Sequence, residues 1–429
     1  MKTILRSFVA ELLAFAARGV VRRYRPKIVM VTGSVGKTST KDAVAAVLST
    51  SFFVRKSEKS YNSEFGVPLT IFGVPNPWGN PFSWLRVIKE AVGLLVLPNH
   101  YPNLLVLEVG ADRPGDLAKI LRIATPDAVI ITRLPDVPVH VEAYATPQAV
   151  RDEEFSPAYA LPPAAPLIVS SSDSFAMEMA LRTPAHVVSY GVAPESDTRL
   201  SQIGFHTEQG IVVGMKAEVT AGDEKGEVII KGSIGEAQMF SAGAAVTIGR
   251  LFGISLTQSI VALAALVPPP GRGRLISGKN ESVLIDESYN SSPAAVEIAL
   301  SNLKKFPARG RRIAVLGDML ELGRYSVKEH ERIGELAAQT VDVVIGVGIR
   351  AKQIVEAARR MGMTVESAFA VDDSSAVAGM LSSFVQKGDV VLVKGSQSIR
   401  TERIVESLLG DPVDISKLVR QEREWKKRV

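Results

Sequence analysis

The stretch "KIVMVTGSVGKTSTKDAV", Lys27 to Val44, decides the fold of this chain. Its apolar run "IVMVT" has the pattern of a strand, and "STKDAVAAVL" has the pattern of a helix. Glycines between them let backbone N–H groups approach a phosphate, and the helix N-terminus adds positive potential there. The stretch therefore predicts a nucleotide-binding P-loop made of Gly33, Ser34, Gly36, Lys37, Thr38 and Ser39.

Two side chains of this loop carry most of the expected chemistry. Lys37 is expected to reach the terminal phosphates, and Thr38 to hold Mg²⁺. The spacing differs from the general G-x-x-x-x-G-K-[ST] pattern, because Val31 occupies the position of the first glycine. An ordinary glycine-rich turn would leave the adjacent Lys-Thr pair unexplained, so nucleotide binding is the favoured interpretation.

Further strand-like runs alternate with helical patterns along the chain: "LLVLEVG", "DAVIIT", "PLIVSS", "RRIAVLGD", "VDVVIGVG" and "DVVLVKGS". Such alternation predicts an α/β fold with parallel sheets covered by helices. The proline-rich segment "LVPPPGRGR", Leu266 to Arg274, is a plausible hinge. We expect an N-terminal helix over 1–26, a central ATP-binding domain over 27–270 with a β-rich insert near 190–235, and a C-terminal α/β domain over 271–429.

Composition narrows the function classes. The 429 residues include no cysteine, which excludes disulfides, thiolate metal sites and cysteine catalysis and fits a reducing compartment such as the cytoplasm. The net charge of +5 is small, and the basic residues gather at "RRYRPK" and at the C-terminal end. No basic stretch is interleaved with aromatic residues, so nucleic acid is not an expected partner.

The segment before the P-loop is expected to form an amphipathic helix. Its apolar run is interrupted by charges, and one helical face would carry Leu5, Phe8, Val9, Leu12 and Ala16. Docking on the following domain is the favoured role. Peripheral contact with an anionic membrane surface is the alternative. No apolar stretch reaches the ~18 residues of a transmembrane helix.

Several blocks in order make the chain similar to the Mur ligases, the ATP-dependent amide-forming enzymes of peptidoglycan precursor synthesis. The resemblance runs from about Ile28 to Leu409. It includes the T-G-x-x-G-K-T loop and the blocks "SYNSEFGVPLT", "LEVGADRPGDL", "VHVEAY", "PGR", "IDESYNSSP", "LGDMLELG" and "VKGSQS". It implies a central P-loop ATPase domain with a parallel sheet and a C-terminal Rossmann-like domain. The last three blocks look like those of family members that add D-Ala-D-Ala to a UDP-linked muramoyl tripeptide.

The resemblance also implies roles for residues. ATP and Mg²⁺ would activate a substrate carboxylate as an acyl phosphate, with Lys37, His140 and Glu154 as catalytic residues. Metal contacts would come from Thr38, Glu108, His140 and Glu154. Nucleotide contacts would extend to Arg272, Glu287 and Asn290, and substrate contacts would come from Asn62, Asp318, Lys394 and Ser396. We expect a monomer.

Some positions depart from the family pattern. The run "TPQAVRDEEFS", Thr146 to Ser156, has no lysine where the family usually has one that becomes carbamylated. We expect Glu154 to replace it, or Glu153 if the register slips by one. The alternative is that these acidic residues only cap a helix start.

Three further departures concern substrate contacts. Ala237 and Ser241 stand where a His and an Asn usually lie near the nucleotide, and Gln397 stands where an arginine is frequent. His330 matches a family position, but a solvated helical histidine is the alternative.

The family's uridine-binding domain normally precedes the P-loop, and here there is room for only one helix. Either the remaining domains recognise a UDP-linked substrate, or another protein supplies that contact, or the carboxylate substrate differs. Two other functions are considered: a ligase of the folylpolyglutamate or polyglutamate synthase type, and a nucleotide-binding regulator without turnover.

Overall fold

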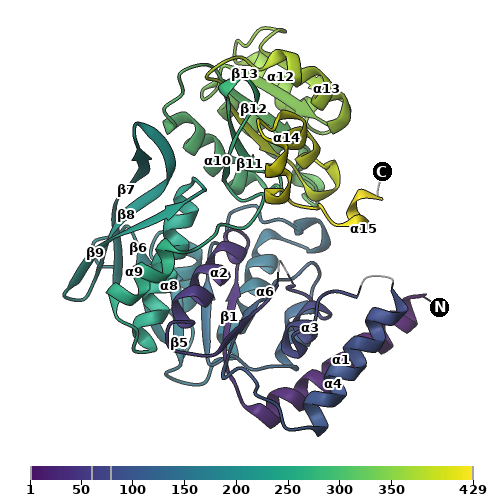
Figure 1. Ribbon diagram of the computed structural model, residues 1–429, viewed down its shortest axis with the longest axis vertical. Helices are drawn as coiled ribbons and strands as arrows, with labels where there is room; N and C mark the ends of the chain where they lie inside the picture. The colour runs from purple at the N-terminus through teal and green to yellow at the C-terminus, as the bar shows by residue number, and fades with distance from the viewer. Residues whose placement is uncertain (1, 59–60, 78–79, 428–429) are drawn as a thin grey trace.

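The structure is a computed structural model that describes residues 2–58, 61–77 and 80–427. Two sheets dominate it, one in each half of the chain (Figure 1). The first sheet has nine strands in this order: β2 (Val54–Lys56), β3 (Leu104–Glu108), β1 (Lys27–Thr32), β4 (Ala128–Ile131), β5 (Pro166–Ser170), β6 (His186–Gly191), β7 (Thr198–Glu208), β8 (Ile211–Ala221) and β9 (Glu224–Lys231).

The strands from β2 to β7 are parallel, and β8 and β9 extend the sheet in antiparallel fashion. The expected β-rich insert is therefore an extension of the first sheet. Alternation along β1 explains how helices cover both faces, since Val29 and Val31 enter one core and Ile28 and Met30 the other. The first core includes α2 (Lys37–Leu48), α8 (Glu236–Leu251) and α9 (Leu256–Ala264).

The second core lies on the opposite face of the same sheet. Its helices are α1 (Lys2–Tyr24), α3 (Gly66–Phe72), α4 (Pro81–Val96), α5 (Asp116–Leu121), α6 (Pro147–Tyr159) and α7 (Ser174–Ala180). A short 3-10 helix, η1 (Val141–Ala143), precedes α6.

The second sheet has six strands in the order β10 (Arg274–Ser277), β11 (Val283–Glu287), β15 (Val390–Lys394), β12 (Arg312–Gly317), β13 (Val343–Val347) and β14 (Ala368–Val371). All its pairings are parallel except β10 with β11. One face packs on α10 (Pro293–Lys305), α11 (Ser326–Ala338) and α12 (Lys352–Arg360). The other face packs on α13 (Ser374–Phe384) and α14 (Glu402–Leu408).

The remaining short elements lie in loops and at the C-terminal end: η2 (Lys279–Glu281), η3 (Gly323–Tyr325), η4 (Gln397–Ile399), η5 (Pro412–Lys417) and α15 (Arg423–Lys426). The parallel strands and their helices agree with the α/β fold expected from the sequence. The proline-rich hinge segment lies between α9 and β10, where the chain passes from the first sheet to the second.

The N-terminal helix packs against α3 and α4, through a face that matches the expected one only in part. Its buried residues are Ala10, Leu13, Ala17 and Val20. Gly19, beside them, lets α4 approach closely, because a Cβ at this position would lie 2.8 Å from Leu95 Cδ2. The predicted face was therefore wrong in part: Phe8 and Leu12 are exposed, whereas Val9 and Ala16 are partly buried and pack against the core. The side chain of Leu5 lies outside the described part of the chain.

Strand β15 lies between β11 and β12 in the second sheet, so a cavity in it should destabilise the protein. Leu392 is fully buried in this strand, which pairs with β11 and β12. Leu392→Ala should lower the free energy of unfolding by about 2–5 kcal/mol, because it removes buried methyl groups and leaves a cavity. Urea denaturation measures the change. Val413→Ala, at an exposed position, is the control and should stay within about 0.5 kcal/mol of the parent. Equal losses in both variants would contradict the packing described.

Candidate active site

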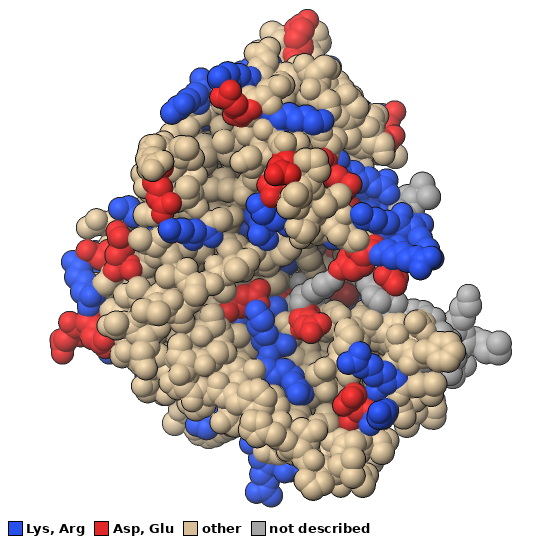
Figure 2. Space-filling model, viewed as in Figure 1, with Lys and Arg blue, Asp and Glu red and all other residues tan. Residues whose placement is uncertain are grey.

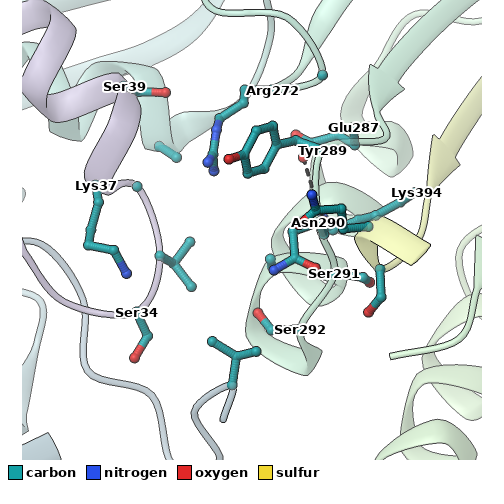
Figure 3. Close-up of a pocket in the computed structure, with 18 of the residues that line it drawn as sticks. Ser34, Lys37, Ser39, Arg272, Glu287, Tyr289, Asn290, Ser291, Ser292 and Lys394 are labelled. Carbon is teal, nitrogen blue, oxygen red and sulfur yellow. Dashed lines mark hydrogen bonds and ion pairs between the residues drawn. The ribbon is translucent and has the colours of Figure 1, made fainter. Parts of the chain in front are cut away.

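A cavity of about 780 Å³ lies between the two sheets. On one side it is lined by the P-loop, and on the other by loops that follow β11, β12 and β15. Figure 3 shows Ser34, Lys37 and Ser39 facing Arg272, Tyr289 and Asn290 across it. These loops follow the carboxyl ends of parallel strands, where open α/β sheets bind ligands.

The P-loop has the shape that phosphate binding requires. Gly33 has a φ of 116°, and a Cβ there would lie 2.5 Å from Thr132 Oγ1, so only glycine fits. Helix α2 starts at Lys37 and directs its N-terminal N–H groups toward the loop. The Lys37 ammonium donates a hydrogen bond to the Gly33 carbonyl and thus closes the loop on itself.

Glu154 is buried beneath this loop. Its Oε2 accepts hydrogen bonds from Thr32 Oγ1 at 2.7 Å and from Gly33 N at 3.1 Å. Its Oε1 lies 3.9 Å from Lys37 Nζ. Glu153, the alternative in the sequence, points elsewhere: its carboxylate accepts from the backbone N–H groups of Gly115 and Leu117 at the start of α5. Helix capping is therefore the role of Glu153, whereas Glu154 extends from α6 and hydrogen-bonds to the P-loop at Gly33.

Glu108 is the second buried carboxylate, at the end of β3. Its Oε1 accepts a hydrogen bond from Thr38 Oγ1 at 3.1 Å. Its Oε2 has no hydrogen-bond partner among the described residues, and Lys41 Nζ lies 3.9 Å from it. A buried carboxylate oxygen beside a hydroxyl is a donor set that a hard cation accepts.

No group of three or more His, Cys, Asp or Glu that could hold a metal ion occurs in the part of the chain that the structure describes. A nucleotide-bound Mg²⁺ needs only one or two protein ligands, because phosphate oxygens and water complete its shell. Thr38 and Glu108 therefore fit a Mg²⁺ that arrives with the nucleotide.

Arg272 joins the two sides of the cavity. It comes from the hinge segment, and its Nη2 donates to Thr38 Oγ1 at 2.9 Å. Its guanidinium lies 4.2 Å from the ring centre of Tyr289, and its carbonyl accepts from Gln238 Nε2. The guanidinium is thus held beside the P-loop by Thr38 of α2 and by Tyr289 of the loop after β11, and α8 holds the backbone of Arg272.

Across the cavity, Lys394 holds the loop after β11. Its Nζ donates to Glu287 Oε2 at 3.1 Å and to the Asn290 carbonyl at 3.0 Å, and it is almost fully buried. Ser396 accepts a hydrogen bond from the backbone N–H of Leu320. Lys394, Glu287, Asn290 and Ser396 all line the cavity, as does Asn62 from the first half of the chain.

His140 makes a second link between the two halves. Its Nδ1 lies 2.8 Å from Glu321 and its Nε2 3.4 Å from Asp112. Burial lowers the pKa of His140, but its hydrogen bond and ion pairs with Glu321 and Asp112 outweigh burial, so the pKa is raised. The same hydrogen bond lowers the pKa of Glu321. The ring thus lies between two carboxylates, one of them from the loop after β12.

Asp318 and His330 support the cavity wall from behind. Asp318 is not among the residues that line the cavity. Its Oδ1 accepts from the Ala351 backbone N–H at 2.7 Å. His330 is fully buried, so the solvated alternative was wrong. Its Nε2 lies 3.0 Å from the Met319 backbone nitrogen and its Nδ1 2.7 Å from the Ser326 carbonyl, which fits a neutral ring that fixes the loop carrying Leu320 and Glu321.

Among the cavity residues that were not singled out in the sequence are Tyr289, Arg400 and Trp425. Tyr289 stands inside the block "SYNSSP" and could have been read from it. Arg400 and Trp425 could not, because they meet only where the C-terminal segment folds back and the Trp425 carbonyl accepts a hydrogen bond from Arg400. Ser241 holds α8 to α2 through Thr40, whereas Ala237 lines the cavity.

The two family models that this chain matches describe Mur ligase domains, and its curated relatives include Mur ligases. Residues 31–236 match the family model described as the Mur ligase middle domain, and residues 271–397 match the Mur ligase, glutamate ligase domain. Among curated relatives, the UDP-N-acetylmuramoyl-tripeptide–D-alanyl-D-alanine ligases of Bacillus subtilis and Escherichia coli are 24% and 27% identical. The matches cover 92% and 90% of this chain, and 79% and 78% of those proteins.

Solved structures agree. The MurF ligase from Thermotoga maritima in complex with ADP has a TM-score of 0.75 and 27% identity, over 93% of this chain and 83% of its own. The folylpolyglutamate synthase of Mycobacterium tuberculosis, complexed with ADP, has a TM-score of 0.64 at 14% identity, over 94% of this chain and 98% of its own. The latter likeness shows the fold alone.

The buried position of His330 predicts a pH effect on stability. Burial lowers the pKa of His330 below its unfolded value of about 6.5, so the unfolded chain binds the extra proton more readily. The stability contributed by the neutral ring is present above that value and is lost as the pH falls below it. His330→Gln should therefore lose less thermal stability than the parent between about pH 7.5 and about pH 5.5.

Differential scanning fluorimetry at both pH values measures this difference. His186→Gln, at an exposed position, is the control and should follow the parent. An equal pH-dependent loss in the His330→Gln protein and the parent would contradict a neutral buried ring.

Proposed function

We propose that this chain, which belongs to the Mur ligase family, is an ATP-dependent ligase that joins D-alanyl-D-alanine to a UDP-N-acetylmuramoyl tripeptide through a new amide bond. The observation that carries the proposal is one cavity in which the P-loop, the buried Glu108 and Arg272 meet loops of the second sheet, with Glu154 buried beneath the P-loop. Such a cavity can hold ATP against a carboxylate substrate on one side and an amine on the other.

The proposed nucleotide is ATP, because the similar MurF ligase from Thermotoga maritima was solved in complex with ADP. The backbone N–H groups at the start of α2 would bind the phosphates, with Lys37 neutralising charge on the γ-phosphate. Arg272 would reach the nucleotide from the other side, next to Thr38. Adenine recognition would differ from the family pattern, since Ala237 lines the cavity with a methyl group and Ser241 is buried in a helix contact.

The residues near Thr38 fit the Mg²⁺ that this chemistry needs. Thr38 and Glu108 would hold it, and it would neutralise charge on the phosphate oxygens during transfer. Glu154 would supply, as a native side chain, the carboxylate that the family usually obtains from a carbamylated lysine. His140 would then act chiefly through Glu321, by closing the second half of the chain over the cavity.

The reaction would proceed in two steps. The substrate carboxylate attacks the γ-phosphorus of ATP, and ADP leaves, which gives an acyl phosphate. The amine of the dipeptide then attacks the acyl carbon, and inorganic phosphate leaves. The protein contributes positioning and charge neutralisation at each step, because phosphoryl transfer demands little covalent work from it.

The dipeptide would bind among the loops of the second sheet. Lys394 is engaged by Glu287 and the Asn290 carbonyl, so we assign it to holding that loop. Arg400 also lines the cavity and lies three residues beyond Gln397, where the family often has arginine. It too is engaged by the protein, since its Nε donates to Glu402 Oε1 at 2.6 Å and its Nη1 to the Trp425 carbonyl at 3.1 Å, and these bonds hold the guanidinium at the cavity wall. We propose Arg400 as the group that meets the dipeptide carboxylate, with Ser396 nearby and Asn62 on the side of the acid substrate.

The proposed location is the cytoplasm, and the proposed assembly is a monomer. ATP and a UDP-linked precursor are cytoplasmic metabolites, and a chain without cysteine fits that compartment. The cavity is lined by residues of a single chain, so a monomer suffices for the reaction.

The decisive experiment is mass spectrometry of a reaction with ATP, Mg²⁺, D-Ala-D-Ala and UDP-N-acetylmuramoyl tripeptide. We expect a product heavier by one dipeptide residue mass, formed with ADP. Lys37→Ala should lower the rate by about 100-fold or more, because it removes charge stabilisation at the transferring phosphate. ATP hydrolysis without amide product would favour a regulator. Amide product only when glutamate replaces D-Ala-D-Ala in the reaction would favour a ligase of the folylpolyglutamate synthase type.

The role of Glu154 gives a separate prediction. Glu154→Gln should lower the rate at limiting Mg²⁺ by about 10- to 100-fold and recover part of it at high Mg²⁺, because a carboxylate near the metal is lost. Glu153→Gln is the matched control, since this neighbour caps α5 and should leave the Mg²⁺ dependence unchanged. A Glu154→Gln protein with the parent's Mg²⁺ dependence would contradict the assignment.

A further inference from the structure

Helices α1 and α4 expose apolar side chains along their outer faces. On α1 these are Phe8, Leu12 and Phe15, the last 72% exposed. On α4 and just after it they are Phe82, Leu85, Ile88, Val92, Val96 and Leu97, with Phe82 80% exposed. Figure 1 places the two helices side by side at the edge of the first half of the molecule. We call these nine residues the α1–α4 face.

In the part of the chain that the structure describes, the nine side chains of this face are not part of a buried core. The opposite sides of the same helices supply the packing, through Leu13 and Val20 of α1 and through Val87, Ala91 and Leu94 of α4. The pair is fixed at its end by Tyr24, which donates to the Leu94 carbonyl at 3.0 Å. Each helix therefore carries a second apolar stripe in contact with solvent, which is unusual in a protein that meets only water.

Basic side chains accompany the face. Arg22, Arg86 and Lys89 are exposed on the two helices, and Arg18 is partly exposed. Glu11 and Glu90 are the acidic residues on these helices, so positive charge is in excess among the described side chains. In Figure 2 the lower right of the molecule, where Figure 1 has α4, is mostly tan with isolated blue and red groups.

We propose that the α1–α4 face binds the surface of an anionic lipid bilayer. An apolar stripe with lysine and arginine beside it is the pattern by which helices lie in a membrane interface, with their apolar face about 5–10 Å deep. Each basic residue near such a surface adds about 1 kcal/mol of attraction. No described helix is long and apolar enough to cross a membrane, so the contact is peripheral.

Charge argues against a second copy of the chain as the occupant. A two-fold contact repeats the same residues on both sides, so it would bring Arg86 and Lys89 of both copies into one interface. An anionic headgroup layer instead pairs those charges. None of the described residues of α1 or α4 lines the cavity, so the proposed contact uses none of the cavity's own side chains.

Vesicle flotation of the full chain tests this proposal. The probes are vesicles of phosphatidylcholine alone and vesicles with about 30 mol% phosphatidylglycerol. We expect flotation with the anionic vesicles only, weakened at high salt and reduced about 10-fold or more in Phe15→Ser/Leu85→Ser. The reduction should be smaller in Arg86→Gln/Lys89→Gln, which keeps the apolar stripe. Ile349→Ser/Val413→Ser removes two exposed apolar side chains elsewhere and should float like the parent.

Thermal melting checks that each variant is folded, and ligase activity in solution should stay at the parent level in all of them. Three outcomes would overturn the proposal: no flotation with anionic vesicles, equal flotation with neutral ones, or equal loss in the Ile349→Ser/Val413→Ser control. A parent dimer in light scattering that Phe15→Ser/Leu85→Ser abolishes, without vesicle binding, would assign the face to a second copy. None of these outcomes depends on the ligase reaction, so the two proposals fail separately.

Discussion

The structure depends on the burial of two carboxylates beneath the P-loop. Glu108 and Glu154 are each almost fully withdrawn from water, which is unfavourable unless cations and hydrogen-bond donors compensate for the lost hydration. Lys37 and Lys41 lie 3.9 Å from these carboxylates, and donors from Thr32, Gly33 and Thr38 complete the arrangement. Negative charge held at that depth favours a divalent cation beside the phosphates of a nucleotide.

Polar contacts around the same cavity also join the two halves of the chain. Arg272 reaches Thr38 from the hinge segment, and Glu321 reaches His140 from beyond β12. One contact links α2 to the hinge segment and the other links the loop at His140 to the loop after β12, so closing the cavity also completes its charge balance. Closure matters for the proposed chemistry, because an acyl phosphate must meet an amine before it meets water.

Local sequence was enough to predict which residues stand at the ends of strands and in the loops that follow them. The P-loop, Glu108 and Lys394 were predicted in this way, and all three line the cavity. Local sequence was not enough where the exposure of a side chain depends on segments far away in the sequence. The exposed face of α1 depends on α3 and α4, and the buried ring of His330 depends on the loop at Met319. Arg400 enters the cavity only because the C-terminal segment folds back onto it.

The most direct test of the account follows oxygen atoms. The reaction is run with a UDP-linked tripeptide whose terminal carboxylate carries ¹⁸O, and the inorganic phosphate is analysed by mass spectrometry. Activation through an acyl phosphate moves one labelled oxygen to phosphate for each amide formed. Amide formation with unlabelled phosphate, or with ¹⁸O in AMP, would contradict transfer of the γ-phosphate in this cavity.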